Sequence, residues 1–285
     1  MKNLHCPVKK RTDIAKIAIC TTCFAIVFFI IFAMLHHIFS NGFPLLSFDF
    51  IAGFNGLLPI IINTLYVCFL SLFIALPISF AAAAYLAFYA KSKRFIRFVN
   101  FMVDSLAGIP SIIFGILGYQ FFVITLGLGF SIFAGTLTLA ICVLPILIKT
   151  TTAAFSSVSN TLKNAGLGMG LSKIFVIRKL ILPRAIPMIS VGIMLAIARI
   201  IGETAALWYT VGIGSTDMPE GIFGHIFAPG RTLSLHLYQA TINPSYNAHT
   251  PHATAIILVL TILAINLIIS KILNRIYAKR SKRHD

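Results

Sequence analysis

The sequence predicts an all-α protein that crosses a membrane six times, and three observations lead to this prediction. Of the 285 residues, 58% are hydrophobic and only 11% are charged, whereas soluble domains carry about a quarter charged residues. Six apolar stretches are long enough for a helix across a bilayer, which takes about 20 residues. The basic residues gather in alternate connecting segments, as they do on the inner side of a membrane.

The spans differ in length and in their content of helix-breaking residues. We expect them at about residues 15–36, 57–89, 98–122, 128–148, 186–212 and 253–273. No small-residue cleavage pattern follows the first, so we interpret it as a retained span and not a removed signal peptide. The second is longer than a span requires and should tilt, or bend at Pro77. The third contains Gly108 and Pro110, which are typical of a bundle with kinked helices.

The distribution of charge predicts that both termini are cytoplasmic. In that topology the inner segments hold 21 of the 23 basic residues, namely Lys2, Lys9, Lys10, Arg11, Lys16, Lys91, Lys93, Arg94, Arg97, Lys149, Lys163, Lys173, Arg178, Lys179, Arg184, Lys271, Arg275, Lys279, Arg280, Lys282 and Arg283. Arg199 lies inside a span, and Arg231 lies outside with the acidic residues Asp49, Asp217 and Glu220. Contact of the basic segments with anionic lipid accounts for most of the formal charge of +16, so we expect no nucleic-acid partner.

Two connecting segments are longer than simple turns. Residues 150–185 should form a cytoplasmic loop of short helices around a turn at Gly166-Leu167-Gly168. Residues 213–252 form an outer segment whose four histidines are spaced too widely for a compact metal site. The chain has no phosphate-binding G-x-x-x-x-G-K-[ST] motif and no nucleophile–base or metal cluster. We therefore expect neither an enzyme nor a cofactor in this chain, and any ATP should be hydrolysed by a partner.

The predicted cytoplasmic loop carries a family resemblance. Residues 164–183 read NAGLGMGLSKIFVIRKLILP, which resembles the coupling loop of ABC-importer permeases, E-A-A, three residues, Gly, nine residues, then I-x-L-P. The matching positions are Ala165, Gly170, Leu180, Leu182 and Pro183, while Asn164 and Gly166 replace the family's acid and second alanine. The loop predicts a knob of two short helices, one ending at Gly170 and one before Pro183, with Asn164 as a helix cap. Such a knob could fit a groove on an ATPase.

Three further stretches resemble the phosphate-specific branch of that family. They are DSLAGIPSIIFG at residues 104–115, PISFAAAAYL at 77–86 and ARIIGETAA at 198–206. Alanine after Glu203-Thr204 is similar to the PstA-type subunit more than to its PstC-type paralogue. The resemblance covers about residues 57–275. It implies a type I ABC-importer permease fold, and it makes phosphate the expected substrate.

Arg199 and Glu203 are the candidate pathway residues because charges inside a membrane span are costly and usually functional. Four residues apart on one helix, they would share a face and could pair, with Asp104 as a third partner. A guanidinium matches the oxygens of phosphate with paired donors. Glu203 would hold Arg199 and keep the empty site near neutral, while Gly202 and Thr204 would supply close backbone approach and a hydroxyl. A buried ion pair that only fixes helix packing is the structural alternative.

These expectations combine into one assembly. Residues 1–56 should hold an N-terminal cytoplasmic segment, the first span and an outer loop, 57–275 the transport domain with coupling loop 150–185, and 276–285 a basic cytoplasmic tail. The resemblance implies a bacterial inner membrane, a second PstC-like permease, two PstB-like ATPase subunits and an extracytoplasmic phosphate-binding protein. Import of sulfate or molybdate, or secondary transport without an ATPase, is the alternative function.

Overall fold

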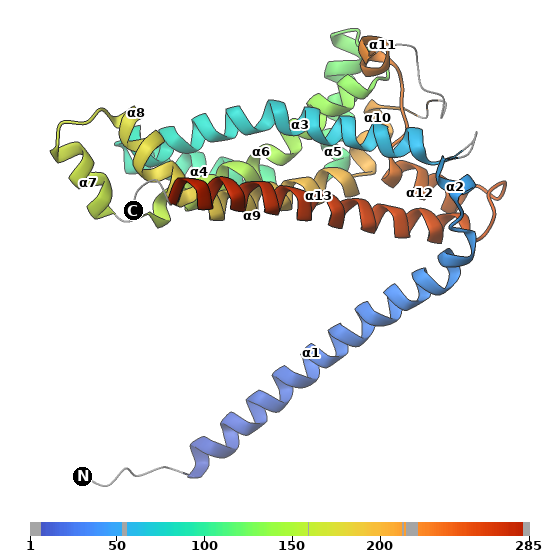
Figure 1. The fold of residues 1–285 in the computed structure, drawn as a ribbon, viewed down its shortest axis with the longest axis horizontal. Helices are drawn as coiled ribbons and strands as arrows, with labels where there is room; N and C mark the ends of the chain where they lie inside the picture. Colours follow the sequence, from blue (N-terminus) through green and yellow to red (C-terminus); the bar gives the residue numbers. More distant parts are fainter. Residues whose placement is uncertain (1–6, 53–55, 159, 213, 215–221, 282–285) are drawn as a thin grey trace.

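The structure is a computed structural model that describes residues 7–52, 56–158, 160–212, 214 and 222–281. Within these residues it is all-helical, as predicted (Figure 1). The order of elements is α1 Pro7–Gly42, η1 Phe43–Leu45, α2 Phe48–Ala52, α3 Leu58–Ala84, η2 Tyr85–Tyr89, α4 Lys93–Gly108, α5 Ser111–Gly118, η3 Tyr119–Thr125, α6 Ile132–Ser157, α7 Asn160–Gly168, α8 Lys173–Phe175, η4 Val176–Ile181, α9 Leu182–Gly202, α10 Ala205–Thr210, α11 Ile222–Phe227, α12 Leu233–Ile242 and α13 Thr250–Ser281.

Five of the six predicted spans are helices of sufficient length and hydropathy among the described residues, at Ile14–Leu45, Leu58–Tyr89, Ile132–Ser157, Lys173–Gly202 and Thr250–Ile272. Ser131 begins the third of these, because its hydroxyl accepts a hydrogen bond from the amide of Ala134 at 3.1 Å. Pro77 lies inside α3 and does not end it. The chain therefore crosses a membrane several times.

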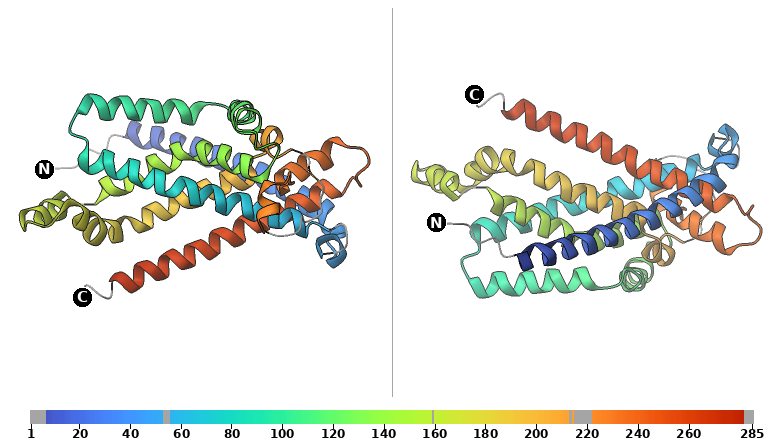
Figure 2. Two further views of the ribbon diagram at one scale, coloured as in Figure 1. Left: turned by 90° about the horizontal axis from the view of Figure 1, so that it is seen from above. Right: turned by 90° about the horizontal axis from the view of Figure 1, so that it is seen from below.

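The span predicted at 98–122 is not one straight helix. Instead α4 and the segment Ser111–Thr125 meet at an angle of 93° (Figure 2). The break falls at Ile109 and Pro110, both of which have extended backbones, with ψ of 130° and 137°. Proline has no backbone N–H and disfavours a helical conformation in the residue before it, which explains the position of the break.

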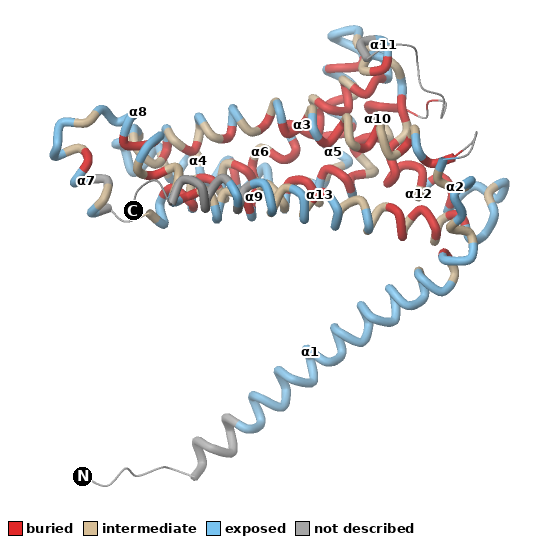
Figure 3. Tube along the Cα trace, viewed as in Figure 1, coloured by how far each residue is buried: buried red, intermediate tan, exposed pale blue. Residues whose placement is uncertain are grey.

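The core lies between α3, α6, α9 and α13, where side chains such as Leu72, Val143, Ile197 and Ile265 form one buried cluster. In Figure 3 the buried positions are red and recur along α3, α6 and their neighbours in the bundle. The spanning part of α1 stands apart, and its apolar window is uncovered by the rest of the chain (Figures 1 and 3). Its outer end is attached beside the start of α13, because the Nδ1 of His249 lies 2.9 Å from the Asn41 carbonyl oxygen.

In the described part of the chain, the first and last helices place both ends of the chain on the same side of the molecule. The start of α1 and the end of α13 lie at the same end of the molecule as α7 (Figures 1 and 2). The opposite end carries α2, α11 and α12. The predicted outer residues Asp217 and Glu220 and the last tail residues Lys282 and Arg283 lie outside the described residues.

Candidate functional site

The helix that carries Arg199 is broken directly after it. Residue Gly202 ends α9, Glu203 has an extended backbone with φ −75° and ψ 126°, and α10 begins at Ala205. This break corrects the single span predicted at 186–212. No proline marks the position, so the break has to be held by contacts from elsewhere in the fold.

Glu203 holds the two sides of the break together. Its side-chain Oε1 accepts a hydrogen bond from the Ala206 amide at 3.4 Å. Its carbonyl oxygen accepts one from the Ser234 hydroxyl of α12 at 2.6 Å. The residue is only 8% exposed. The carboxylate therefore acts inside the protein, as the acceptor of the Ala206 backbone N–H at the start of α10.

Arg199 contacts Cys142 and is not paired with Glu203. Its Nη2 lies 3.6 Å from the Sγ of Cys142 on α6, and the residue is exposed on this chain. Within the described part of the chain the two residues form no ion pair. The predicted pair on one helix face is therefore wrong, because the helix ends between the two residues. Among the described residues, the guanidinium therefore has no carboxylate within ion-pair distance.

The break opens onto free space. A Cβ placed on Gly202 would meet no other atom within 4 Å. Thr204 lines a cavity of about 290 Å³ together with Ile112, Ala205, Trp208, Tyr209 and Tyr238. The rings of Trp208 and Tyr238 meet edge to face with their centroids 5.3 Å apart. Thr204 therefore lines this cavity, whereas Arg199 and Gly202 are exposed residues that are not part of its lining. Their common role in a pathway stays a prediction.

The two broken spans touch each other beside this cavity. On α5, Gly115 packs against α10 so closely that a Cβ would lie 2.8 Å from the Cα of Ala206. Backbone packed on backbone leaves no room for adjustment. The bend after α4 and the break after α9 are therefore parts of one arrangement, with Ile112 and Thr204 on the wall of the same cavity.

Asp104 does not join this region as a partner of Arg199. Its Oδ1 lies 2.6 Å from the Nζ of Lys149, which corrects the expected third charge beside Arg199. The sequence reasoning missed Lys149 because it ended the fourth span at residue 148. In the structure α6 continues to Ser157. A signal was available, since no glycine or proline occurs between Lys149 and Ser157.

The predicted coupling loop is shorter than 150–185, since α6 extends into it from one side and α8, η4 and α9 from the other. The turn lies at Gly170, with φ +76°, a conformation that favours glycine. Ser172 then accepts from the Phe175 amide at 3.3 Å to begin α8. The predicted turn at 166–168 is wrong, because these residues form the last turn of α7.

Two further expectations for the loop are corrected. The second helix does not end before Pro183, because Leu182 and Pro183 begin α9, where a proline is tolerated. Asn164 lies inside α7 and is not its cap, although Ala165 still accepts from the Met169 amide at 3.1 Å. Gly166 lets α7 approach η4, since a Cβ there would lie 2.8 Å from the Cδ1 of Leu180.

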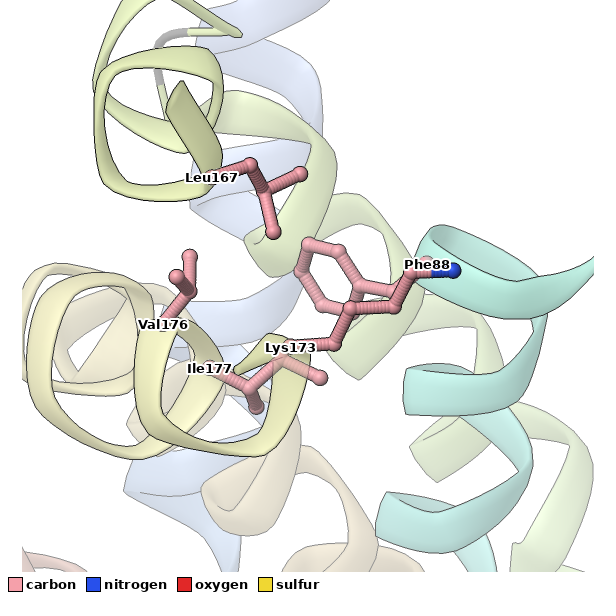
Figure 4. A pocket seen from close by; sticks show the side chains of 5 residues that line it. All are labelled: Phe88, Leu167, Lys173, Val176 and Ile177. Atoms are coloured by element: carbon pink, nitrogen blue, oxygen red, sulfur yellow. The ribbon is translucent and has the colours of Figure 1, made fainter. Parts of the chain in front are cut away.

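A pocket lies between this loop and the inner end of the second span. It has a volume of about 170 Å³ and is lined by Phe88, Leu167, Lys173, Val176 and Ile177. Figure 4 shows Leu167 of α7 and Phe88 of η2 facing this space from different elements. Lys173 places its Nζ 5.1 Å from the centre of the Tyr89 ring, within the range of a cation–π contact. The loop is therefore a folded knob seated on the body.

The outer end holds a second group of polar residues, on and beside α12. Arg231 donates to the Tyr246 hydroxyl at 3.1 Å and to the Gly214 carbonyl at 3.4 Å. The His236 ring meets the Tyr246 ring edge to face at 5.5 Å. Burial, and then the Arg231 charge, lower the pKa of His236 to about 4. This histidine is therefore a neutral part of the outer structure at pH 7.

Comparison with known proteins connects this architecture to transport. A family model described as "Binding-protein-dependent transport system inner membrane component" matches residues 75–283. A probable ABC transporter permease from Bacillus subtilis (strain 168) is 30% identical over 292 residues, covering 95% of this chain and 98% of that protein. A "Phosphate transport system permease protein PstA homolog" from Mycoplasma pneumoniae is 34% identical over 226 residues, covering 76% of this chain. This chain spans 34% of the Mycoplasma protein.

A solved structure shares the fold. It is the crystal structure of a bacterial ABC transporter involved in the import of the acidic polysaccharide alginate, with a TM-score of 0.64 and 18% identity. The match covers 93% of this chain and 96% of that chain. At this identity the likeness supports the arrangement of helices alone.

Proposed function

The chain belongs to the family of binding-protein-dependent transport system inner membrane components, and on this premise we propose that it is the permease subunit of an ATP-driven phosphate importer. Relatives at 31–34% identity carry the name of phosphate transport system permeases. In this role Arg199, Gly202, Thr204 and the cavity that Thr204 lines form part of the path of the anion.

The observation that carries the proposal is the position of the Arg199 guanidinium. It is exposed beside open backbone at Gly202, while the nearest acid along the chain, Glu203, is buried and engaged elsewhere. An unneutralised cation inside a spanning helix is costly unless it meets water or an anion. Its planar set of donors matches the oxygens of a tetrahedral oxyanion. Glu203 then acts by fixing the break, not by pairing with Arg199.

The direction of transport explains the need for an ATPase. Moving one negative charge inward against 100 mV costs about 2.3 kcal/mol, and phosphate carries between one and two charges at neutral pH. A passive pore would release phosphate from the cell. A permease that exposes its site to one side at a time, driven by ATP on a partner, avoids this loss. This chain itself needs no cofactor for that role.

The remaining partners follow from the surfaces of the fold. The knob at residues 158–172 would dock into two PstB-like ATPase subunits together with the same region of a second, PstC-like permease. The opposite end, with α2, α11 and α12, would receive phosphate from an extracytoplasmic binding protein. In this arrangement residues 57–275 form the transport domain, the basic tail 276–285 contacts lipid, and both termini are cytoplasmic in the bacterial inner membrane.

Uptake by cells that carry the full importer tests the proposal. Arg199→Gln should reduce phosphate uptake to background while all subunits still co-purify, because the variant loses the charge and keeps the helix. Arg184→Gln is the matched control on the same helix, since Arg184 is exposed and donates only weakly to the Leu180 carbonyl at 3.5 Å. Normal phosphate uptake by Arg199→Gln would refute the assignment of the path. Stronger competition by sulfate or molybdate than by unlabelled phosphate would assign the other oxyanion as substrate.

A further inference from the structure

The Asp104–Lys149 ion pair lies on the membrane-spanning part of the chain yet is not covered by it. The two side chains are 52% and 59% exposed. In sequence Lys149 is the one charged residue of α6. It lies eight residues before the end of the helix at Ser157, or about 12 Å along the axis at 1.5 Å per residue.

The second helix gives a similar depth for the pair. Asp104 lies eleven residues after the start of α4 at Lys93, or about 16 Å along the axis. That start lies at the end of the molecule where α7 is found (Figure 2). Both partners therefore lie about two to three helical turns from the inner ends of their helices, on segments apolar enough to enter a membrane. Charges at this depth avoid lipid and face a polar passage or another protein.

The pair also lies in register with Arg199. The guanidinium of Arg199 contacts Cys142 of α6, and Lys149 follows Cys142 by seven residues. Seven residues are two helical turns, so Cys142 and Lys149 lie on the same face of α6, about 10 Å apart along its axis. Lys149 is on the side of Arg199 that leads toward the knob at 158–172. Arg199 of α9, which contacts this face, and Lys149, which lies on it, thus follow one another in the direction of import.

We propose that Lys149 is a second anion-contacting residue of the pathway, and that an oxyanion leaving Arg199 displaces Asp104 from it. The inference rests on the proposed function of anion import. Asp104 neutralises the lysine while the site is empty, which lowers the cost of a charge at this depth. When the carboxylate returns to Lys149 it competes with the bound anion and so promotes release to the inner side. Asp104 is a positioning residue, and Lys149 touches the substrate.

A structural role for the pair makes different predictions. If the ion pair only tethers α4 to α6, then neutralising either partner should have the same effect, and exchanging the two charges should restore function. If Lys149 contacts the anion, its loss should be worse than the loss of Asp104. Exchange of the two charges should then fail to restore uptake, because the cation would lie on α4 and would no longer be in register with Arg199.

The experiment measures phosphate uptake and ATPase activity of the complete importer in proteoliposomes. We expect Lys149→Gln to lower the maximal rate by at least tenfold and Lys149→Arg to retain most of it. We expect Asp104→Asn to lower the maximal rate and the KM together, because the anion is held longer. Lys91→Gln is the control, since it removes one exposed cation that lies between η2 and α4 and is not part of the ion pair.

Each outcome decides the inference. Wild-type uptake by assembled Lys149→Gln overturns it, and so does restored uptake by the exchanged pair Asp104→Lys/Lys149→Asp. If Lys149→Gln does not assemble, the double variant Asp104→Asn/Lys149→Gln leaves no unpaired charge, and wild-type uptake by it overturns the inference. Failure of the proposed function looks different, because the wild-type complex itself would then show no phosphate uptake.

Discussion

Replacing Gly115 by alanine should push α5 and α10 apart at the point where the two broken spans touch. A Cβ at this position would lie 2.8 Å from the Cα of Ala206 and 3.2 Å from the carbonyl oxygens of Ala205 and Ala206. Carbon atoms in contact prefer about 3.5–4.0 Å, so α5 and α10 would have to move apart by about 1 Å. The obstructing atoms are backbone atoms, which cannot rotate away. Overpacking of this kind costs about 1–3 kcal/mol.

The displacement should affect both stability and transport. A loss of about 1–3 kcal/mol corresponds to a fall in Tm of about 2–12 °C, at 2–4 °C per kcal/mol for a chain of this size. Because α10 starts directly after the break at Glu203, the same shift disturbs the wall of the cavity beside Thr204. Phosphate uptake should therefore fall even at temperatures where the complex remains folded.

Thermal unfolding of the purified complex and uptake in cells measure these two effects. Gly108→Ala is the matched control, because it adds the same methyl group nearby, where no atom lies within 4 Å. That variant should unfold and transport like the wild type. If Gly115→Ala gives the same Tm and uptake as Gly108→Ala, the packing of α5 on α10 does not support the site and the reasoning fails.

Three shorter predictions concern the knob and the outer end. Gly170→Val should strain a backbone held at φ +76° by about 1–2 kcal/mol and so weaken co-purification of the ATPase. Gly168→Val is its control, because a Cβ there meets no atom within 4 Å. Equal yields of co-purified ATPase from the two variants would contradict the prediction. Ser234→Ala should leave the buried carbonyl of Glu203 without its donor, costing about 1–3 kcal/mol, and an unchanged Tm and uptake would refute the role of this bond. The pKa of His236 is lowered to about 4, below its unfolded value of about 6.5, so the unfolded chain binds the extra proton and stability falls as pH drops from about 6.5 to 4. His236→Gln should flatten the dependence of Tm on pH in that window, and an unchanged slope would contradict it.

The membrane class and most spans were predictable from the sequence because hydrophobicity is a local property. Each apolar run is long enough to cross a bilayer whatever its neighbours are, and the basic segments orient the chain independently of packing. Pro110 also indicated an interruption in the third span, although the angle of 93° between its two helical parts was not predictable. Glycine indicated a turn in the loop for the same local reason, since few other residues adopt a positive φ, but the prediction placed the turn at residues 166–168 and the structure places it at Gly170.

The site depended on contacts between distant parts of the chain. The break after Gly202 has no proline at its position, and it is held by Ser234, 31 residues away. For that reason the pairing of Arg199 with Glu203, which a continuous helix would allow, does not form. Asp104 and Lys149 are 45 residues apart in sequence and meet only because α4 lies against α6. Hydropathy thus determined which segments enter the membrane, whereas tertiary packing decided where the helices break and which charges remain free to meet an anion.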